Sequence, residues 1–158
     1  MTTVYSDVRT DTTQDDPSEF VKANQLAGSL RVARAVFEAS ALPADDVIEM
    51  FALPNGARIV EGFAYFDNLG ASTDISVGHA AYVNSAGTTV AADPDEFLGE
   101  TATTSAGRAN VAATLALGAN TEVDLDGEDA SNEYVVTVTM LNAAGTGTIE
   151  LVMFYVVD

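Results

Sequence analysis

Hydrophobic and polar residues alternate along most of the chain after residue 30, with the two-residue period of a β-strand that buries one face. The period recurs in 74–83, 109–117 and 134–140. In the first of these segments it places five residues on one side: Ile75, Val77, His79, Ala81 and Val83. The pattern therefore predicts strands in these segments, each with one buried face.

Two other segments, 57–66 and 148–157, are apolar at both odd and even positions. A strand with two apolar faces is typical of the middle of a sandwich, or of a surface that another subunit covers. We expect either of these two situations here.

Residues that favour turns separate the strand-like runs at short intervals. Pro54-Asn55-Gly56 divides 47–53 from 57–66, and Gly- and Asn-rich turns follow at 68–72, 84–87 and 142–147. Seven or eight short strands of this kind predict an all-β fold, an antiparallel β-sandwich or barrel. The sequence Asp93-Pro94-Asp95-Glu96 resembles a helix start and predicts a short helix near Phe97 in a longer connection.

The beginning of the chain has a different character. Residues 1–16 are polar, with little to bury, and read as an extended arm. Asp16 is placed to cap a short helix that begins at Pro17 and ends near Gly28. We therefore divide the chain into an N-terminal arm with a short helix (1–28) and a β-sandwich domain (29–158).

The charge of the chain excludes several classes of partner. Its 158 residues include 24 Asp and Glu but only 6 Lys and Arg, a formal net charge of −18. Such a charge repels phosphate, so we expect no nucleic-acid partner. No apolar run approaches the ~20 residues of a membrane helix, and the polar segment 1–16 does not suit a secretory signal. Hydrophobic residues still make up 47% of the chain, enough for a core, and the acidic excess is typical of marine or hypersaline media.

The sequence predicts a protein that is not an enzyme. It has no Cys, and its single histidine, His79, falls on the apolar face of a strand. It also lacks a Gly-x-Ser-x-Gly elbow, a Gly-x-Gly-x-x-Gly loop and a P-loop. We therefore assign no catalytic residue and expect no organic cofactor.

One acidic segment, 122–133, has the spacing of a calcium-binding loop. Carboxylates alternate along it, a glycine is sixth and a glutamate is twelfth, as in an EF-hand. The candidate ligands are Glu122, Asp124, Asp126, Glu128 and Glu133. Glu122 replaces the usual Asp, Asp129 occupies a position that is normally apolar, and the flanking segments read as strands. The alternative is an acidic hairpin or loop in which Gly127 adopts a positive φ.

Two groups of side chains have both a structural and a functional interpretation. Arg31 and Arg34 can pair with acids of a neighbouring subunit, but we prefer ordinary surface pairs within the same chain. Phe63, Tyr65 and Phe66 have the spacing of core residues, which we prefer to a platform on which sugars stack.

Three stretches of the sequence resemble a known class of proteins. The strand 53–63 (Leu-Pro-Asn-Gly-Ala-Arg-Ile-Val-Glu-Gly-Phe) leads through Asp67-Asn68-Leu69-Gly70 to the strand 74–78 (Asp-Ile-Ser-Val-Gly). This arrangement resembles small β-rich virion proteins of tailed viruses. The resemblance implies a jelly-roll-like capsid decoration or cement protein, a homotrimer on the outer surface of the shell that bridges major capsid subunits. It also implies that the N-terminal arm lies across the surface of the capsid. The resemblance assigns no ligand residue to this chain.

Three alternatives stay open. The chain could be a tail or fibre component of a virion, or a carbohydrate-binding or adhesion sandwich from a non-viral source. A calcium-stabilised secreted domain of a halophile is the third.

Overall fold

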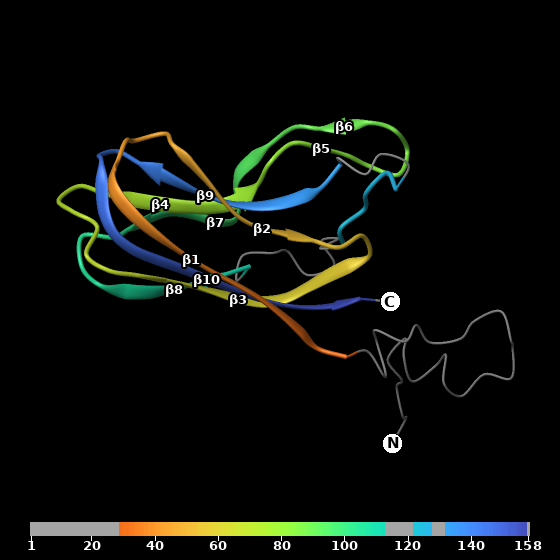
Figure 1. Cartoon of the computed structure of the whole chain (residues 1–158), viewed down its shortest axis with the longest axis horizontal. Coiled ribbons are helices and arrows are strands. Elements are labelled where there is room, and N and C mark those ends of the chain that lie inside the picture. Colours follow the sequence, from red (N-terminus) through yellow and green to blue (C-terminus); the bar gives the residue numbers. More distant parts are fainter. Residues whose placement is uncertain (1–28, 113–121, 128–131, 158) are drawn as a thin grey trace, which may run out of the picture.

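Two four-stranded antiparallel sheets face each other in the computed structural model of the chain (Figure 1), which describes residues 29–112, 122–127 and 132–157. The first sheet has the order β1–β10–β3–β8 and the second has the order β2–β9–β4–β7. The strands of the first sheet are β1 (Arg31–Leu42), β10 (Gly145–Val157), β3 (Ala57–Phe66) and β8 (Gly107–Val111). Those of the second are β2 (Val47–Leu53), β9 (Tyr134–Leu141), β4 (Asp74–His79) and β7 (Asp93–Ala102). A small hairpin pairs β5 (Tyr82–Val83) with β6 (Thr89–Val90).

Successive strands mostly change sheet. β1 to β4 alternate between the first and second sheets, and β7 to β10 alternate again, starting in the second. Neighbours within a sheet therefore come from distant parts of the chain, and β1 pairs with β10 along most of its length. Because these pairings are non-local, neither sheet can form from one continuous stretch of sequence.

A single apolar layer between the sheets forms the core. It contains the inward side chains of the central strands, which are almost fully buried: Ile75, Val77, Val136, Val138, Met140, Ile149, Leu151 and Met153. The inward set predicted for 134–140 is confirmed, since Tyr134, Val136, Val138 and Met140 are all in the core. The prediction of a single buried face is wrong for this strand, because Thr137 and Thr139 on the opposite face are buried as well. Burial of one face of each strand is the main stabilising contribution that the sequence pattern predicts.

The segments with two apolar faces occupy the middle of the first sheet. β10 has β1 on one side and β3 on the other, so its backbone is paired along both edges. On the inner face Leu151 lies opposite Ala64, and on the outer face Val152 lies opposite Phe63. The central position expected from the sequence is confirmed, and it leaves apolar side chains on the outside of the sheet.

The turn at Pro54–Gly56 is held by the acidic segment 122–127. The Asn55 side-chain amide accepts from the Leu125 backbone N–H at 2.9 Å and donates to the Leu125 carbonyl oxygen at 3.3 Å. The Val123 carbonyl oxygen accepts from the Gly56 backbone N–H at 2.8 Å. Gly56 itself adopts a φ of 75°, as the predicted tight turn requires.

The prediction of a short helix near Phe97 is wrong. Residues 93–102 form β7, which pairs with β4 through His79 and Asp93, Val77 and Leu98, and Ile75 and Thr101. The helix-start sequence instead makes a local contact, in which the Asp95 backbone N–H donates to the Asp93 carboxylate at 3.2 Å. The register of the β4–β7 pairing shifts twice, between Ile75 and Val77 and between Val77 and His79. Phe97 is buried in this strand.

The structure changes the limits of some predicted segments, and other predicted segments fall outside the described residues. The expected strand 74–83 is interrupted after His79, and its last two residues form β5. β8 ends at Val111, and 113–117 lie outside the described residues, as do the arm and helix predicted for 1–28. No helix in the described part of the chain has the length and apolar character needed to cross a membrane.

Gly78 provides a test of the packing between β4 and β7. A Cβ atom at this position would lie 1.9 Å from the Asp93 carbonyl oxygen, whereas one at Gly99 on β7 would meet no atom within 4 Å. We expect Gly78→Ala to destabilise the protein by about 1–3 kcal/mol, because backbone atoms of β7 must move. Each kcal/mol lowers the unfolding temperature by roughly 2–4 °C in a chain of this size.

Thermal unfolding followed by circular dichroism measures the difference, with Gly99→Ala as the matched control on the neighbouring strand. Equal unfolding temperatures for the two variants would contradict the close approach of β7 to Gly78.

Candidate interaction surfaces

The outer face of the first sheet carries a patch of apolar and aromatic side chains. Strand pairing aligns them: Phe63 lies opposite Val152, and Phe154 lies opposite Val32. Tyr65 follows Phe63 by two residues and therefore shares its side of the sheet. We name this patch the outer aromatic face, and its members are Val32, Val36, Phe63, Tyr65, Val152 and Phe154.

The rings of this face contact one another. The ring centroids of Phe63 and Phe154 are 6.4 Å apart in an edge-on arrangement, and those of Phe63 and Tyr65 are 6.3 Å apart. The guanidinium carbon of Arg108 lies 4.8 Å from the centroid of the Phe63 ring, a cation–π geometry. These contacts hold the side chains in place on a rigid sheet.

The edge strand of this face leaves large apolar side chains in solvent. Val32 and Val36 on β1 are 57% and 52% exposed, and Tyr65 on β3 is 40% exposed. Glu150 lies between Val36 and Tyr65 on this face, and Arg34 lies between Val32 and Val36, so Val36 flanks the other apolar members. Exposed apolar side chains gathered on one face of a folded domain are typical of an interaction site. The preference for Phe63 and Tyr65 as core residues is therefore wrong, whereas Phe66, which points inward and is 8% exposed, is in the core as predicted.

The outer aromatic face carries charges of both signs, from Arg34 and Arg108 and from Glu38, Glu61 and Glu150. Arg34 forms an ion pair with Glu150, which confirms the intramolecular partner expected for this arginine. The hydrogen bond from Arg34 lowers the pKa of the Glu150 carboxyl and raises the pKa of Arg34. Because both groups are open to solvent, this pair adds little to stability, and its main effect is to neutralise two of the charges on the face.

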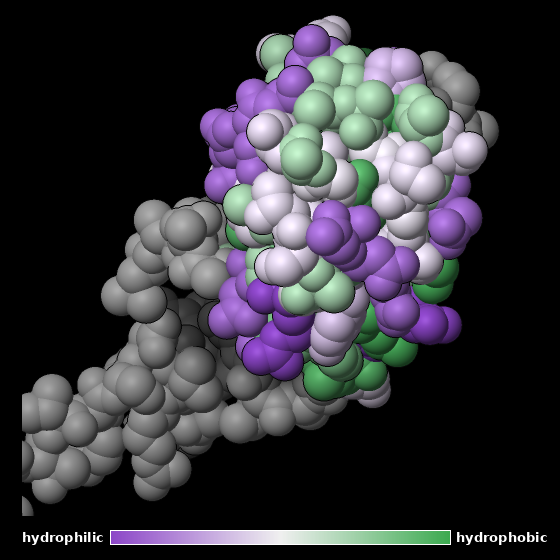
Figure 2. Space-filling model, turned by 90° about the vertical axis from the view of Figure 1, so that its left-hand side faces the viewer, coloured by the Kyte–Doolittle hydropathy of each residue, from purple (hydrophilic) through white to green (hydrophobic). Residues whose placement is uncertain are grey.

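The end of the sandwich that carries the β1–β2, β3–β4 and β9–β10 turns has a different surface. Hydrophilic and apolar residues are interspersed over this end (Figure 2).

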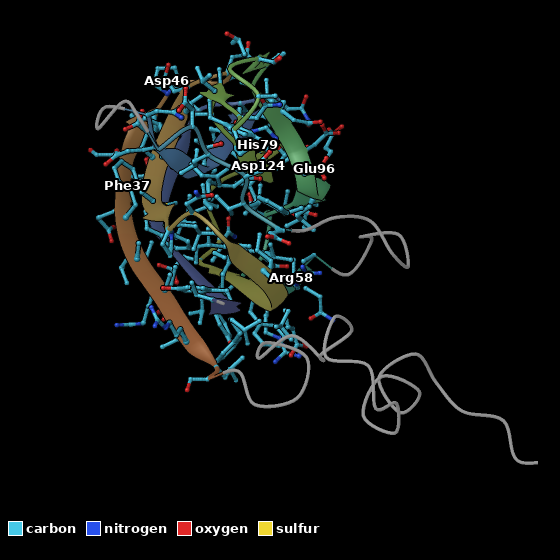
Figure 3. The ribbon with its side chains drawn as sticks, turned by 90° about the vertical axis from the view of Figure 1, so that its right-hand side faces the viewer. Phe37, Asp46, Arg58, His79, Glu96 and Asp124 are labelled. Carbon is cyan, nitrogen blue, oxygen red and sulfur yellow. The ribbon has the colours of Figure 1, made fainter. Side chains whose placement is uncertain are left out.

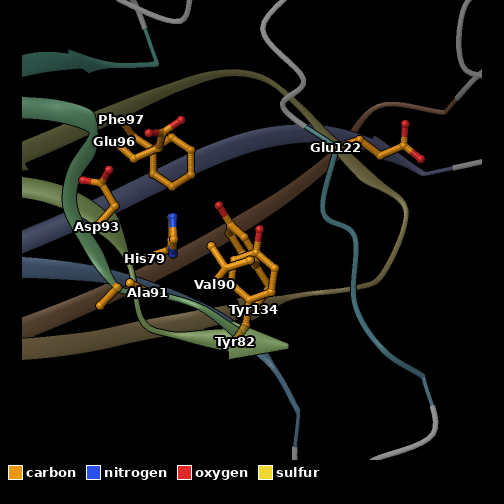
Figure 4. Close-up of a pocket in the computed structure, with 10 residues that line it drawn as sticks. His79, Tyr82, Val90, Ala91, Asp93, Glu96, Phe97, Glu122 and Tyr134 are labelled. Atoms are coloured by element: carbon orange, nitrogen blue, oxygen red, sulfur yellow. The ribbon is translucent and has the colours of Figure 1, made fainter. Parts of the chain in front are cut away.

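A cavity of about 430 Å³ opens beside His79, between β4, β7 and the start of β9. We name it the His79 cavity (Figure 4). Side chains of three kinds line it: aromatic rings from His79, Tyr82, Phe97 and Tyr134, carboxylates from Asp93, Glu96 and Glu122, and the aliphatic side chains of Val90, Ala91 and Ala92. In Figure 3, His79 and Glu96 lie on the β7 side of the sandwich, across the molecule from Phe37 on β1.

His79 packs against two tyrosines. Its ring centroid lies 5.1 Å from that of Tyr134 and 5.4 Å from that of Tyr82, and the two tyrosine rings are 4.9 Å apart. His79 is 7% exposed, so its predicted place on the buried face is confirmed. Sequence reasoning missed the cavity itself, because its lining comes from segments that are far apart in the chain.

Burial changes the ionisation of both tyrosines. It raises the pKa of Tyr134 well above the usual value, and the negative charges of Tyr82, Glu96 and Asp93 raise it further. Burial also raises the pKa of Tyr82, with smaller contributions from Asp124 and Glu96. Both phenols thus stay neutral to a higher pH than a tyrosine in solvent.

The acidic segment expected to bind calcium is extended where the structure describes it. Val123 and Leu125 point into the core, and Glu122, Asp124 and Asp126 alternate with them on the more exposed side. Glu122 forms an ion pair with Arg58. The expected positive φ of Gly127 is not observed.

Of the remaining candidate ligands, Glu133 is exposed just before β9 and Glu128 lies outside the described residues. Within residues 29–112, 122–127 and 132–157, no three acidic or histidine side chains are close enough to hold a metal ion. The calcium site stays a prediction. An unfolding temperature that is the same in calcium and in chelator would contradict it.

The fold of the chain is shared with chains of phage capsids. The structure is similar to a chain in the capsid of Ralstonia phage GP4, with a TM-score of 0.61 and 19% identity over 90% of this chain and 93% of that one. It is also similar to a chain of the cyanophage Pam1 capsid asymmetric unit, with a TM-score of 0.59 and 15% identity over 84% and 88% of the two chains.

A third similar chain belongs to the acidic stable capsid structure of Helicobacter pylori bacteriophage KHP30, with a TM-score of 0.53 and 18% identity over 83% and 90% of the chains. No family model and no curated protein matches the sequence. At these identities the similarity is one of fold. The resemblance to virion proteins that the strand and turn pattern indicated is therefore confirmed at the level of fold.

The raised pKa of Tyr134 predicts how stability depends on alkaline pH. Because the unfolded chain ionises this phenol more readily, its contribution to stability is complete below the unfolded pKa near 10 and is lost as the pH rises toward the folded pKa. We expect Tyr134→Phe to lose less stability than the wild type between about pH 10 and 12. Unfolding temperatures measured across this range, with the exposed-ring variant Tyr65→Phe as control, test the difference; parallel curves for all three proteins would contradict it.

Proposed function

We propose that the protein is a structural component of a phage virion, a capsid decoration or cement protein that binds the outer surface of the shell and bridges neighbouring major capsid subunits. The observation that carries this proposal is the outer aromatic face on a fold shared with phage capsid chains. Exposed Val32, Val36 and Tyr65 have no partner surface in the described part of the molecule, so they suit contact with another protein.

The order of the strands supports a jelly-roll fold as part of this proposal. Two four-stranded sheets between which most successive strands alternate are expected of a jelly roll, an architecture found in viral capsid domains. We propose that residues 1–28, which lead into β1 at the edge of the first sheet, act as the arm that extends over the shell.

The proposed role is mechanical and needs no catalytic group. Apolar area buried between the outer aromatic face and the shell opposes separation of its subunits. The strong negative charge suits a location on the outside of the virion, away from the packaged nucleic acid. We propose a homotrimer, because three copies can bridge several capsid subunits at once, and light scattering of the isolated protein measures its mass.

One observation favours a second candidate, a carbohydrate-binding or adhesion sandwich. Tyr65 is exposed beside Phe63, as a sugar-stacking site requires. Against this candidate, Arg108 already covers the Phe63 ring and Phe154 packs against its edge. Tyrosine fluorescence that does not respond to glycans would count against the alternative.

A pair of valine variants tests which face binds the shell. Val36 on β1 and Val47 on β2 are similarly exposed, at 52% and 58%, but they belong to edge strands of opposite sheets. We expect Val36→Glu to weaken binding to shells purified without this protein by roughly tenfold, because a buried, unpaired carboxylate costs more than 1 kcal/mol. Val47→Glu should bind like the wild type, and both should unfold at similar temperatures.

Co-sedimentation with such shells measures the binding. Loss of binding with Val47→Glu alone would show that the second sheet faces the shell and would contradict the proposed surface. Absence of the protein from purified virions, measured by quantitative mass spectrometry, would overturn the virion role. Copies in the hundreds per particle favour decoration, and far fewer favour the tail or fibre alternative.

A further inference from the structure

The His79 cavity combines hydrogen-bond acceptors with the hydroxyl groups of Tyr82 and Tyr134, which can either donate or accept. The Nδ1 atom of His79 lies 2.9 Å from the Ala80 carbonyl oxygen, which can only accept, so Nδ1 carries the proton. In the neutral ring this leaves Nε2 as an acceptor, and the hydrogen bond that the described structure gives the His79 ring is the one at Nδ1. The carboxylates of Asp93 and Glu96, which line the same cavity, accept only.

The negative charge at the cavity is not neutralised within the described part of the chain. The cavity lining contains neither lysine nor arginine. The ion pairs of the described residues are Arg34 with Glu150 and Arg58 with Glu122. Arg58 therefore balances Glu122, whereas Asp93 and Glu96 take part in no ion pair there.

Aromatic rings form another part of the wall, beside the aliphatic side chains of Val90, Ala91 and Ala92. His79, Tyr82 and Tyr134 are in mutual contact, and the centroid of the Phe97 ring lies 6.4 Å from that of His79 (Figure 4). A cation within about 6 Å of such a ring is attracted to its face. The chain already uses this arrangement elsewhere, where Arg108 covers the ring of Phe63.

A guanidinium group matches this combination of acceptors, charge and rings. It is planar, always charged and weakly hydrated, it stacks on aromatic faces, and its five N–H donors pair with carboxylates. A metal ion fits less well, because the described residues group no three ligands. The cavity volume of about 430 Å³ lies within the range of ~300–1,000 Å³ found for ligand sites.

We propose that the His79 cavity is a binding site for a guanidinium group, supplied either by an arginine side chain of another polypeptide or by a small guanidinium compound. The guanidinium stacks against the tyrosine rings and donates to Asp93, Glu96 and Nε2 of His79. This site is separate from the outer aromatic face and does not depend on the proposed virion role.

Nuclear magnetic resonance of the full chain, prepared without a histidine tag, tests the proposal. His79 is the single histidine, so its imidazole signals report on the cavity without ambiguity. We expect N-acetyl-arginine methylamide to shift these signals saturably. The citrulline analogue, which has nearly the same shape but a neutral urea group, should leave them unchanged. Equal shifts with both compounds, or no shift with the arginine compound, would overturn the proposal.

Two neighbouring acids on β7 provide matched variants. Glu96 lines the cavity and the adjacent Asp95 does not, yet both are exposed, and each can lose its charge with a minimal change of shape. Glu96→Gln should weaken binding of the arginine compound roughly tenfold, the loss expected for one charged hydrogen bond. Asp95→Asn should bind like the wild type. An equal loss in both variants would indicate attraction by the overall charge and contradict a specific site.

Further ligands separate the sources of the group. The lysine analogue should bind more weakly than the arginine compound, and equal binding would contradict selection for guanidinium. If N-acetyl-arginine methylamide binds more tightly than methylguanidine, the natural ligand is an arginine within a polypeptide. If methylguanidine binds more tightly, the natural ligand is a small guanidinium compound. Because the isolated protein is used throughout, failure here leaves the shell-binding experiment unaffected, and the reverse also holds.

Discussion

The position of β10 in the middle of the first sheet is the constraint on which the rest of the structure depends. Its inward residues Ile149, Leu151 and Met153 are fully buried and form the centre of the core. Its outward residues Val152 and Phe154 belong to the outer aromatic face. The strand that stabilises the fold thus also positions the candidate interaction surface, so that surface is as rigid as the core beneath it.

The inward positions of the strands were predictable from the sequence because burial in the core imposes the two-residue period directly. The limits 47–53 and 57–66 agree with β2 and β3, and 134–140 lies within β9. Burial of the outer face of β9 at Thr137 and Thr139 was not predictable, because polar residues at these positions indicate exposure. The segment 93–98 was not predictable in this way. Its Asp-Pro-Asp-Glu signal is local, and the pairing with β4 that overrides it involves residues far away in the sequence. Residues that favour a helix start give no information about whether a distant strand is available to pair with the segment.

The candidate surfaces were only partly accessible to sequence reasoning. An apolar strand with two faces does not reveal which face is inside, so Phe63 and Tyr65 could not be separated from Phe66 without the second sheet. The acidic segment 122–127 has a second pattern besides the spacing of a calcium-binding loop. Val123 and Leu125 alternate with the carboxylates, and this alternation indicates an extended segment as readily as a calcium loop.

The distribution of charge gives the two surfaces different physical characters. A chain with a net charge of −18 repels its own copies, so a contact between proteins is favoured where the surface is nearly neutral and apolar. The outer aromatic face comes closer to this condition than the chain as a whole, because Arg34 and Arg108 offset two of the three carboxylates on it, those of Glu38, Glu61 and Glu150. The His79 cavity is the opposite case, since its carboxylates keep their charge beside aromatic walls. Salt at about 1 M reduces the Debye length to ~3 Å and removes the repulsion between copies, but it leaves direct contacts inside the cavity largely intact. The same acidic composition therefore allows apolar association at one face and selective binding of a cation at the other.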